Sequence, residues 1–311
     1  MITFVADQCV FGKTVQLLRS EGHTVVTLKE LEKQGATDDE VQCVNGHRER
    51  LYRTEAIVLK RRDQGEADRV LTVFTPGVGK QQLLAKGVRK VTSRKAGHVE
   101  LFTHSQFLVA KGSTWDIVTQ AETIHAFRPL REDLQRISYG YYVAELVDRF
   151  TQEGDENRSL FDLLLATLGW LSKAQDLPLL ARFFELRLLA LVGYRPQFFQ
   201  CAHCRADIEP VNNFWSPAAG GVLCPRCGEG LIERPGNDRP SAEPLSLNAL
   251  KVLRFLQTHD WKTCSRLRLT PALHAEVEGV LQRYILYQLE RSLKSVGFLR
   301  TVRRLLASSG Q

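Results

Sequence analysis

The spacing of apolar residues changes partway along the chain, near residue 127. Before that point, five short runs rich in β-branched and aromatic residues are separated by turn sequences, which predicts five strands. In the fourth run, Thr103, Phe107 and Val109 alternate with Phe102 and Leu108, as expected where the two faces of a strand differ. This part of the chain is therefore predicted to be all-β. The predicted strands span residues 52–61, 67–75, 80–86, 99–110 and 114–122.

Turn chemistry separates these predicted strands. The sequence Pro76-Gly77-Val78-Gly79 favours a tight hairpin between the second and third strands. Five strands within about 75 residues suit a small closed barrel. The five-stranded barrel whose face and loops bind oligonucleotides is the OB-fold, so we expect an OB-fold over residues 51–127.

Beyond residue 127 the apolar residues follow the period of a helix, with one predicted helix ending near residue 150. The apolar residues of that helix lie along one face, which is expected to be buried. They are Leu134, Ile137, Tyr141, Ala144 and Val147.

The remaining sequence predicts more helices. Residues 270–297 should form one long helix, whose apolar stripe fits the core of a helical bundle better than a partner site. The fold class is therefore expected to be α+β and multidomain, with the OB-fold barrel followed by an α-helical domain over residues 130–311. Further helices are expected over residues 159–173, 176–193 and 246–257.

Four of the seven cysteines form two Cys-x-x-Cys pairs, Cys201 with Cys204 and Cys224 with Cys227. Four thiolates at this spacing are typical of a closed tetrahedral zinc site, which leaves no position for a reacting water. We therefore expect a structural zinc module over residues 199–230, inserted between helices. Two disulfides or a redox pair are the alternative, which the lack of a signal-peptide pattern and of a thioredoxin-like pattern disfavours.

The overall charge changes the picture of possible partners. The 311-residue chain has a formal net charge of +7, which favours polyanionic partners. No apolar run approaches the roughly 18 residues of a membrane span, and no basic-then-apolar signal peptide opens the chain. We expect a cytoplasmic, nucleoid-associated protein that does not bind membranes.

The basic residues are densest in the predicted barrel, in the loop of residues 86–98. Gly87 and Gly97 near its ends allow close approach to a backbone, so the loop suits contact with phosphates. A solvated loop is the plainer alternative. Trp115 and Phe74 are nearby candidates for base stacking, although Phe74 fits the barrel core better.

Several sequence blocks occur in the order of one bacterial family, from about residue 51 to the C-terminus. These blocks resemble the recombination mediator family RecO. The resemblance implies an N-terminal OB-fold, an α-helical body, and a zinc module in members that keep the cysteines. The blocks are residues 52–60, 65–69, 86–90, 100–102, 184–196 and 289–299.

The same resemblance implies a function. Members bind single- and double-stranded DNA, anneal complementary strands and, with the partner RecR, help RecA to replace single-strand-binding protein on DNA gaps. They also dock the acidic C-terminal tail of single-strand-binding protein on their helical region. The DNA contacts that this implies here are Arg61, Lys86, Arg89, Lys90, Arg94 and Lys95.

Residues 1–48 depart from the RecO pattern. They are expected to form a strand, a helix, a strand and an acidic loop, which looks like the opening of a small PIN-like nuclease domain of the toxin-associated kind. Asp7 and one of Asp38, Asp39 and Glu40 would then help to bind a divalent metal. Because the segment is well under half of such a domain, we expect it to be inactive. A mis-assigned start or a gene-fusion remnant is favoured over an accessory docking lobe.

Two other classes of function stay open at this point. An OB-fold RNA-binding protein with a structural zinc ribbon would share the basic barrel, but it does not explain the helical and C-terminal blocks. A metal-dependent nuclease would use the N-terminal acids. The single histidines His98, His104 and His125 are typical of packing residues, and no nucleophile, base and orienting group can be assembled from them. We therefore expect no enzymatic activity.

Overall fold

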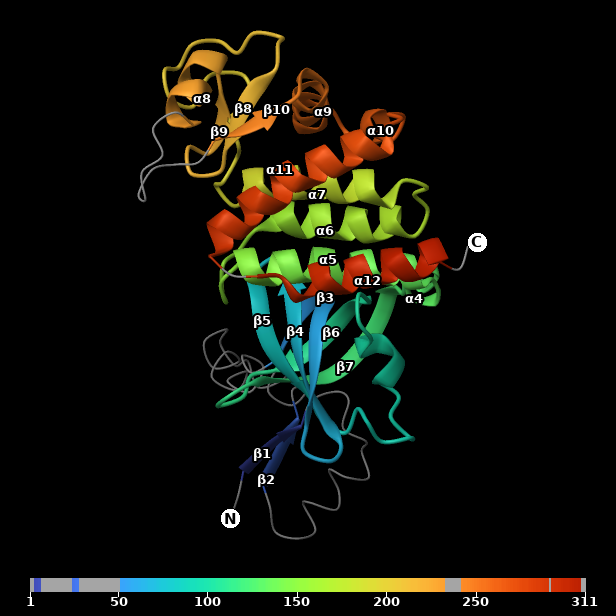
Figure 1. Ribbon diagram of the computed structural model, residues 1–311. Coiled ribbons are helices and arrows are strands. Elements are labelled where there is room, and N and C mark those ends of the chain that lie inside the picture. The colour runs from blue at the N-terminus through green and yellow to red at the C-terminus, as the bar shows by residue number, and fades with distance from the viewer. Residues whose placement is uncertain (1–2, 7–23, 28–50, 233–241, 291, 309–311) are drawn as a thin grey trace.

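The structure is a computed structural model of the chain. It describes residues 3–6, 24–27, 51–232, 242–290 and 292–308. A β-barrel, stacked helices and a small β-containing module succeed one another along the long direction of the molecule (Figure 1). The predicted fold class, an OB-like barrel followed by a helical domain, is confirmed.

Five strands close into a barrel in the order β3-β4-β5-β7-β6. Neighbouring strands are antiparallel except β5 and β7, which pair in parallel through Leu83 with Asp116 and Leu84 with Ile117. This closure gives the five-stranded barrel typical of OB-folds. The strands are β3 (Leu51–Gln64), β4 (Asp68–Thr75), β5 (Gly79–Ala85), β6 (His104–Ala110) and β7 (Asp116–His125).

The fourth predicted strand starts later than expected, at His104 instead of residue 99. The 3-10 helix η2 (Ala96–Val99) and a turn occupy the preceding residues. Phe102 adopts a φ of 64°, and its amide donates to the carbonyl of Val58 at 2.8 Å. The Phe102 side chain is buried in the core that the helices share with the barrel, and not in the barrel's own interior. The alternation of apolar and polar residues in the sequence cannot show that Phe102 points to the helices instead of the barrel interior.

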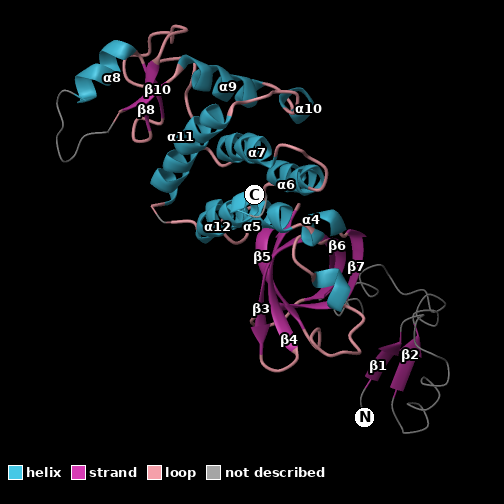
Figure 2. Ribbon diagram, turned by 45° about the vertical axis from the view of Figure 1, so that its right-hand side comes forward, coloured by secondary structure: helices cyan, strands magenta, loops and turns pink. Residues whose placement is uncertain are grey.

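Helices cover one end of the barrel and stack away from it, so that α5, α6, α7 and α11 form successive layers (Figures 1 and 2). Side-chain caps begin several of them: Asp133 accepts from the amide of Arg136, and Asp176 from that of Leu179. The helices are α4 (Arg128–Glu132), α5 (Leu134–Phe150), α6 (Arg158–Leu171), α7 (Leu177–Leu191), α8 (Pro225–Ile232), α9 (Leu247–Thr258), α10 (Trp261–Cys264), α11 (Pro271–Leu289) and α12 (Lys294–Ser308).

The predicted buried face of α5 is wrong in part. Leu134 and Tyr141 are 50% and 38% exposed, whereas Tyr142 and Val143 are completely buried. Helix α5 contacts β3, α6, α7 and α12, so apolar residues surround it on most sides and no single stripe marks the core.

The predicted long helix over residues 270–297 is two helices. Helix α11 ends before Glu290, which adopts a left-handed φ of 51°, and α12 begins at Lys294. Helix α12 then returns to pack against α5 in the antiparallel direction, since Glu145 meets Ser295 while Tyr139 meets Arg303. A positive φ at a residue other than glycine left no signal in the sequence.

A buried polar network joins the helices. Arg182 and Glu185 of α7 are 2.5 Å apart and almost completely buried, and Tyr142 of α5 donates to Glu185 at 2.5 Å. Glu278 of α11 accepts from Arg303 of α12 at 2.8 Å. Arg182 also lies 3.5 Å from Glu278 and links the two groups, so removal of one partner would leave an uncompensated charge among four helices.

Two further parts of the chain adjoin the barrel and the stacked helices: a small module and a pair of N-terminal strands. The module between α7 and α9 contains β8 (Asn213–Ser216), β9 (Gly221–Leu223) and β10 (Glu243–Leu245), in the order β10-β8-β9.

Near the N-terminus, β1 (Thr3–Ala6) and β2 (Thr24–Thr27) lie where two strands were expected, and they pair in parallel. The helix expected between them and the acids Asp7, Asp38, Asp39 and Glu40 lie outside the described residues. Among the helices that the structure describes, none has the length and apolar character needed to cross a membrane.

Candidate nucleic-acid surface and metal centre

The four paired cysteines come together at the module between α7 and α9. Cys201 and Cys204 lie in the segment after α7, Cys224 follows β9, and Cys227 lies in α8. Their sulfur atoms all lie within 4.8 Å of one another, and the Sγ atoms of Cys204 and Cys224 are 3.8 Å apart. Sulfur atoms about 3.8 Å apart fit a tetrahedral zinc ion with zinc–sulfur bonds of about 2.3 Å.

Local backbone geometry creates this cluster. The amide of Arg205, which has a φ of 67°, donates to the carbonyl of Cys201 at 3.0 Å and turns the chain back on itself. In the second pair, a Cβ atom on Gly228 would lie 2.2 Å from the ring of Phe214, so only glycine fits there. The two turns bring four thiols to one point.

The four thiols differ in how readily they ionise, since burial and the neighbouring thiols raise the pKa of Cys224 and Cys227. Burial opposes ionisation of Cys201, but the amides of Cys204, Cys224 and His203 point toward its sulfur and lower its pKa to about 6. A thiolate is the form that binds zinc. Exposed His203 is not among the clustered ligands, so four sulfur atoms are the donor set that the described residues offer.

The cysteine module packs on the helical body through aromatic rings. Trp215 of β8 is completely buried, with its ring centroid 5.6 Å from that of Phe198 and 5.4 Å from that of Tyr284 of α11. A metal in the cluster would hold the module's turns in the shape that presents Trp215 to the bundle. With four protein ligands it would have no open position for chemistry.

The basic loop between β5 and η2 presents most of the predicted DNA contacts. Val88 is 1% exposed and anchors the loop in the barrel core. Two hydrogen bonds from backbone amides hold its base against the β3–β4 turn: the amide of Gly87 donates to the carboxylate of Asp68 at 2.7 Å, and that of Arg89 donates to the carbonyl of Ala67 at 2.9 Å. The four exposed cations of this loop are Lys86, Arg89, Lys90 and Arg94.

Two other predicted contacts differ from these four. The ammonium of Lys95 donates to the carbonyl of Val118 at 2.8 Å, and partial burial lowers its pKa, so Lys95 ties the loop to β7. Arg61 lies in β3 near its turn to β4 and forms an ion pair with Glu100, and Arg89 of the loop lies 3.5 Å from Asp63, two residues further along the same strand. The structure therefore places five of the six residues in the loop of residues 86–98, four of them exposed, and Arg61 on the neighbouring strand.

Phe74 and the histidines of the barrel have partners within the protein. Phe74 is completely buried in the shared core, and Trp115 is half-buried. His98 accepts from the amide of Thr123 at 3.1 Å. His104 lies 3.0 Å from Glu55 and stacks on His125 with a centroid distance of 5.6 Å.

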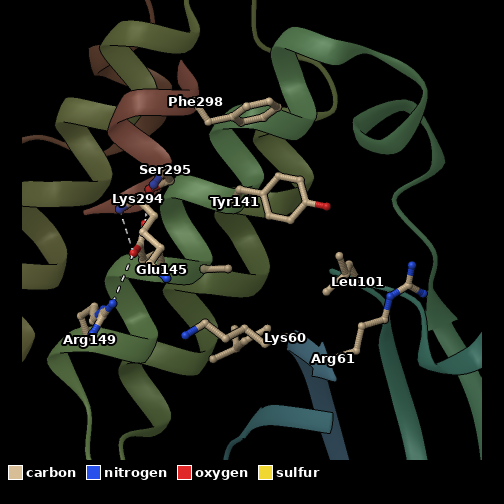
Figure 3. Close-up of a pocket in the computed structure, with 11 residues that line it drawn as sticks. Lys60, Arg61, Leu101, Tyr141, Glu145, Arg149, Lys294, Ser295 and Phe298 are labelled. Atoms are coloured by element: carbon tan, nitrogen blue, oxygen red, sulfur yellow. Dashed lines mark hydrogen bonds and ion pairs between the residues drawn. The ribbon is translucent and has the colours of Figure 1, made fainter. Parts of the chain in front are cut away.

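Sequence reasoning missed a pocket of about 770 Å³ where the barrel meets α5 and α12 (Figure 3). Tyr141 and Phe298 line one side of it and Lys60 lies across from them. The available signals were Tyr141, which the helix pattern assigned to the core, and Phe298, which directly follows the predicted last helix. The pocket is lined by Leu59, Lys60, Arg61, Leu101, Tyr141, Ala144, Glu145, Arg149, Lys294, Ser295 and Phe298.

Comparison with known proteins adds the family. The model "Recombination protein O N terminal" matches residues 50–127, and "Recombination protein O C terminal" matches residues 131–296. Among similar proteins is the DNA repair protein RecO of Roseiflexus sp. (strain RS-1), which is 46% identical over 262 residues that cover 84% of this chain and 89% of that protein.

Two further relatives carry the same name, DNA repair protein RecO. That of Pelotomaculum thermopropionicum is 39% identical over 264 residues, which cover 84% of this chain and 98% of the relative. That of Dehalococcoides mccartyi (strain ATCC BAA-2266) is 35% identical over 253 residues, which cover 81% and 96%. Since the matched models together follow the barrel and the helical body, and the relatives match along nearly their whole length, this chain belongs to the RecO family of recombination and DNA repair proteins.

Proposed function

We propose that this protein is a recombination mediator that binds single- and double-stranded DNA, anneals complementary strands and, with RecR, helps to load RecA onto DNA coated with single-strand-binding protein. One observation carries the proposal: a chain of the RecO family presents Lys86, Arg89, Lys90 and Arg94 on an anchored loop of an OB-like barrel. We assign the main contacts with phosphate to these four residues, and additional contacts to Arg61 and Lys95.

Annealing by such a surface needs no covalent chemistry. Two complementary strands repel each other through their phosphates. Cations that neutralise the phosphates release condensed counterions and lower this barrier, while the base edges stay accessible for pairing. The proposal therefore assigns no catalytic residues, and it assigns zinc held by Cys201, Cys204, Cys224 and Cys227 a structural role.

The expected partners follow from the same family. They are RecR, the acidic C-terminal tail of single-strand-binding protein and, indirectly, RecA, in the bacterial cytoplasm at the nucleoid. The PIN-like start is proposed to be inactive. An added-metal control tests this, because a nuclease that uses Asp7 would cut DNA only with Mg²⁺ or Mn²⁺ and would lose this activity in Asp7→Ala.

The first prediction concerns the basic loop. Arg89→Glu with Lys90→Glu should weaken binding of a single-stranded oligonucleotide about tenfold or more at moderate salt, because two attractive interactions with phosphate become repulsive. The slope of log affinity against log salt should fall by about one for each phosphate that is no longer neutralised. Fluorescence anisotropy across a salt series measures both quantities, and the rate of annealing of labelled complementary strands should fall in parallel.

The matched control makes the same charge change on exposed lysines of α9 and α10, Lys251→Glu with Lys262→Glu. This control should retain most of the affinity. Equal decreases in both double variants would indicate an effect of net charge alone, and unchanged affinity in the loop variant would contradict the proposal. A marked preference for RNA over DNA in the same titration would favour an RNA-binding function instead.

A further inference from the structure

A continuous series of ion pairs connects the basic loop with strand β3. Arg89 of the loop lies 3.5 Å from Asp63, which accepts from Nε of Arg69 at 2.9 Å. On its other side, Arg69 lies 3.7 Å from Glu100, which also pairs with Arg61. Three arginines therefore alternate with two carboxylates, and we call these five residues the ion-pair series.

The register of β3 and β4 aligns the members that lie on these strands. Asp63 is directly opposite Arg69, and Arg61 is directly opposite Leu71. Opposite residues share a face of the sheet, and Leu71 belongs to the barrel interior. The charged side chains continue this inward-facing row to where it meets solvent, since the Asp63 side chain is 54% exposed. Figure 3 shows the guanidinium of Arg61 directed away from neighbouring Lys60.

The carboxylates engage arginines that are proposed to contact DNA. Exposed ion pairs commonly belong to a solvated surface and contribute little to stability. In this series, however, Arg89 and Arg61 at the two ends are among the proposed phosphate contacts. A guanidinium binds a carboxylate or a phosphate through the same fork of N–H donors. A carboxylate beside such an arginine therefore occupies donors that a phosphate would otherwise use.

Asp63 is held in its charged form. The hydrogen bond from Arg69 keeps the pKa of Asp63 below its ordinary value, although some desolvation opposes this. Asp63 is consequently an anion throughout the neutral pH range, as a competitor of phosphate must be.

We propose that Asp63 and Glu100 are internal competitors of DNA phosphate. In the free protein they neutralise Arg61, Arg69 and Arg89, and phosphates replace them on these arginines when a strand binds. Arg69 is then a further phosphate contact, which lies between the basic loop and Arg61 and joins them into one path.

This inference rests on the proposed function and deepens it, because an annealing protein has to release the duplex that it makes. A surface of cations alone would hold the duplex at least as strongly as the separate strands, since a duplex carries more phosphate per unit length. Carboxylates that return to the arginines as phosphates leave stabilise the free protein. They should therefore lower the affinity and accelerate release.

The first test measures affinity by fluorescence anisotropy of a labelled single-stranded oligonucleotide with the full-length protein. Asp63→Asn keeps the size of the side chain but removes its charge. It should tighten binding about two- to fivefold at moderate salt, the effect of one exposed ion pair. Asp63→Asn with Glu100→Gln should tighten binding further. Glu66→Gln is the matched control, since it makes the same change of net charge in the exposed turn beside Asp63 but outside the series; its affinity should change less than twofold.

Two further measurements separate competition from a purely structural role. Arg69→Gln should weaken binding and lower the salt slope by about one, and Asp63→Asn should tighten binding less in this background, because one arginine that it frees is gone. After mixing with excess unlabelled competitor, labelled duplex should dissociate more slowly from Asp63→Asn with Glu100→Gln than from the wild type. Thermal unfolding of each variant checks that the fold is retained.

Weaker binding by Asp63→Asn would overturn the inference, since the acid would then position the arginines instead of competing with phosphate. Tightening equal to that of Glu66→Gln would also contradict it, because net charge alone would explain the effect. Unchanged DNA binding together with altered binding of RecR would assign the series to a protein interface instead. A wild type that binds no DNA would remove the proposed function, and this inference with it.

Discussion

At Gly228 a single hydrogen atom faces the ring of Phe214, and this close approach shows how strictly individual residues determine the cysteine cluster. The spacing of the four cysteines predicted the cluster, because ligand number and loop length are local properties of the sequence. The different roles within the basic loop were not predictable. Whether a lysine is exposed, as Lys90 is, or bonds to the carbonyl of Val118, as Lys95 does, depends on strands brought together by the fold.

At the same scale, Cys224→Ser should remove stoichiometric zinc and destabilise the module. Metal binding by small zinc peptides is worth roughly 10 to 16 kcal/mol, so its loss should abolish the native packing of Trp215. Metal analysis and tryptophan fluorescence measure the two effects. His203→Ala is the control within the same turn and should keep the metal, since exposed His203 is not among the clustered ligands. Full zinc content and unchanged thermal stability in Cys224→Ser would count against the four-sulfur site.

At the scale of elements, the start of α12 depends on another helix. The carboxylate of Glu145 of α5 receives the first free amides of α12 and so caps it from outside. The period of apolar residues located most helices, since it reflects a local pattern. The pattern did not predict the end of α11 at Glu290, which has a left-handed backbone. It also did not predict that Tyr141 is at the surface, because which face of α5 is buried depends on the elements packed around it.

This cap predicts a dependence on pH. Burial would raise the pKa of Glu145, but the donors of Ser295 and Lys294 outweigh burial and hold it below its ordinary value. A carboxyl with a lowered pKa in the folded state contributes stability above the pKa of the unfolded chain, about 4.3, and this contribution is lost as the pH falls through the folded value.

The thermal midpoint of the wild type should therefore fall more steeply between about pH 6 and pH 3 than that of Glu145→Gln, which has no charge to lose. Calorimetry at several pH values measures this difference. Glu132→Gln, which changes an exposed acid of α4, should retain the wild-type slope. Parallel curves for the wild type and Glu145→Gln would show that the cap carries no charge effect.

For the whole molecule, one core unites the barrel with the helices. Ile57, Phe74 and Phe102 of the barrel segment belong to the same buried cluster as α5 and α7. Lys80 of β5 adds polar ties, since its ammonium donates to the carbonyls of Asp148 and Thr151. The sequence predicted the barrel and the helical body but not their shared core. The residues of that core come partly from the strand-forming sequence before residue 127 and partly from the helix-forming sequence after it.

One consequence is cooperative unfolding of the barrel and the helical body. Phe102→Ala should cost about 3 to 5 kcal/mol, since a fully buried ring is lost, and should separate the unfolding of the two parts. Far-ultraviolet circular dichroism reports the helices, and hydrogen exchange of strand amides reports the barrel. Coincident transitions in the wild type that split in the variant are expected. Coincident transitions in both proteins would show that the shared core does not depend on this ring.

The pairing of α5 with α12 also imposes an order on biosynthesis. Glu145 and Ser295 are 150 positions apart in the sequence, so a ribosome completes α5 long before the segment that covers it. During that interval the nascent chain holds a carboxylate and apolar side chains without their final neighbours. This side of α5 is therefore accessible to chaperones during synthesis, and the packing of α12 against it is among the last steps of folding.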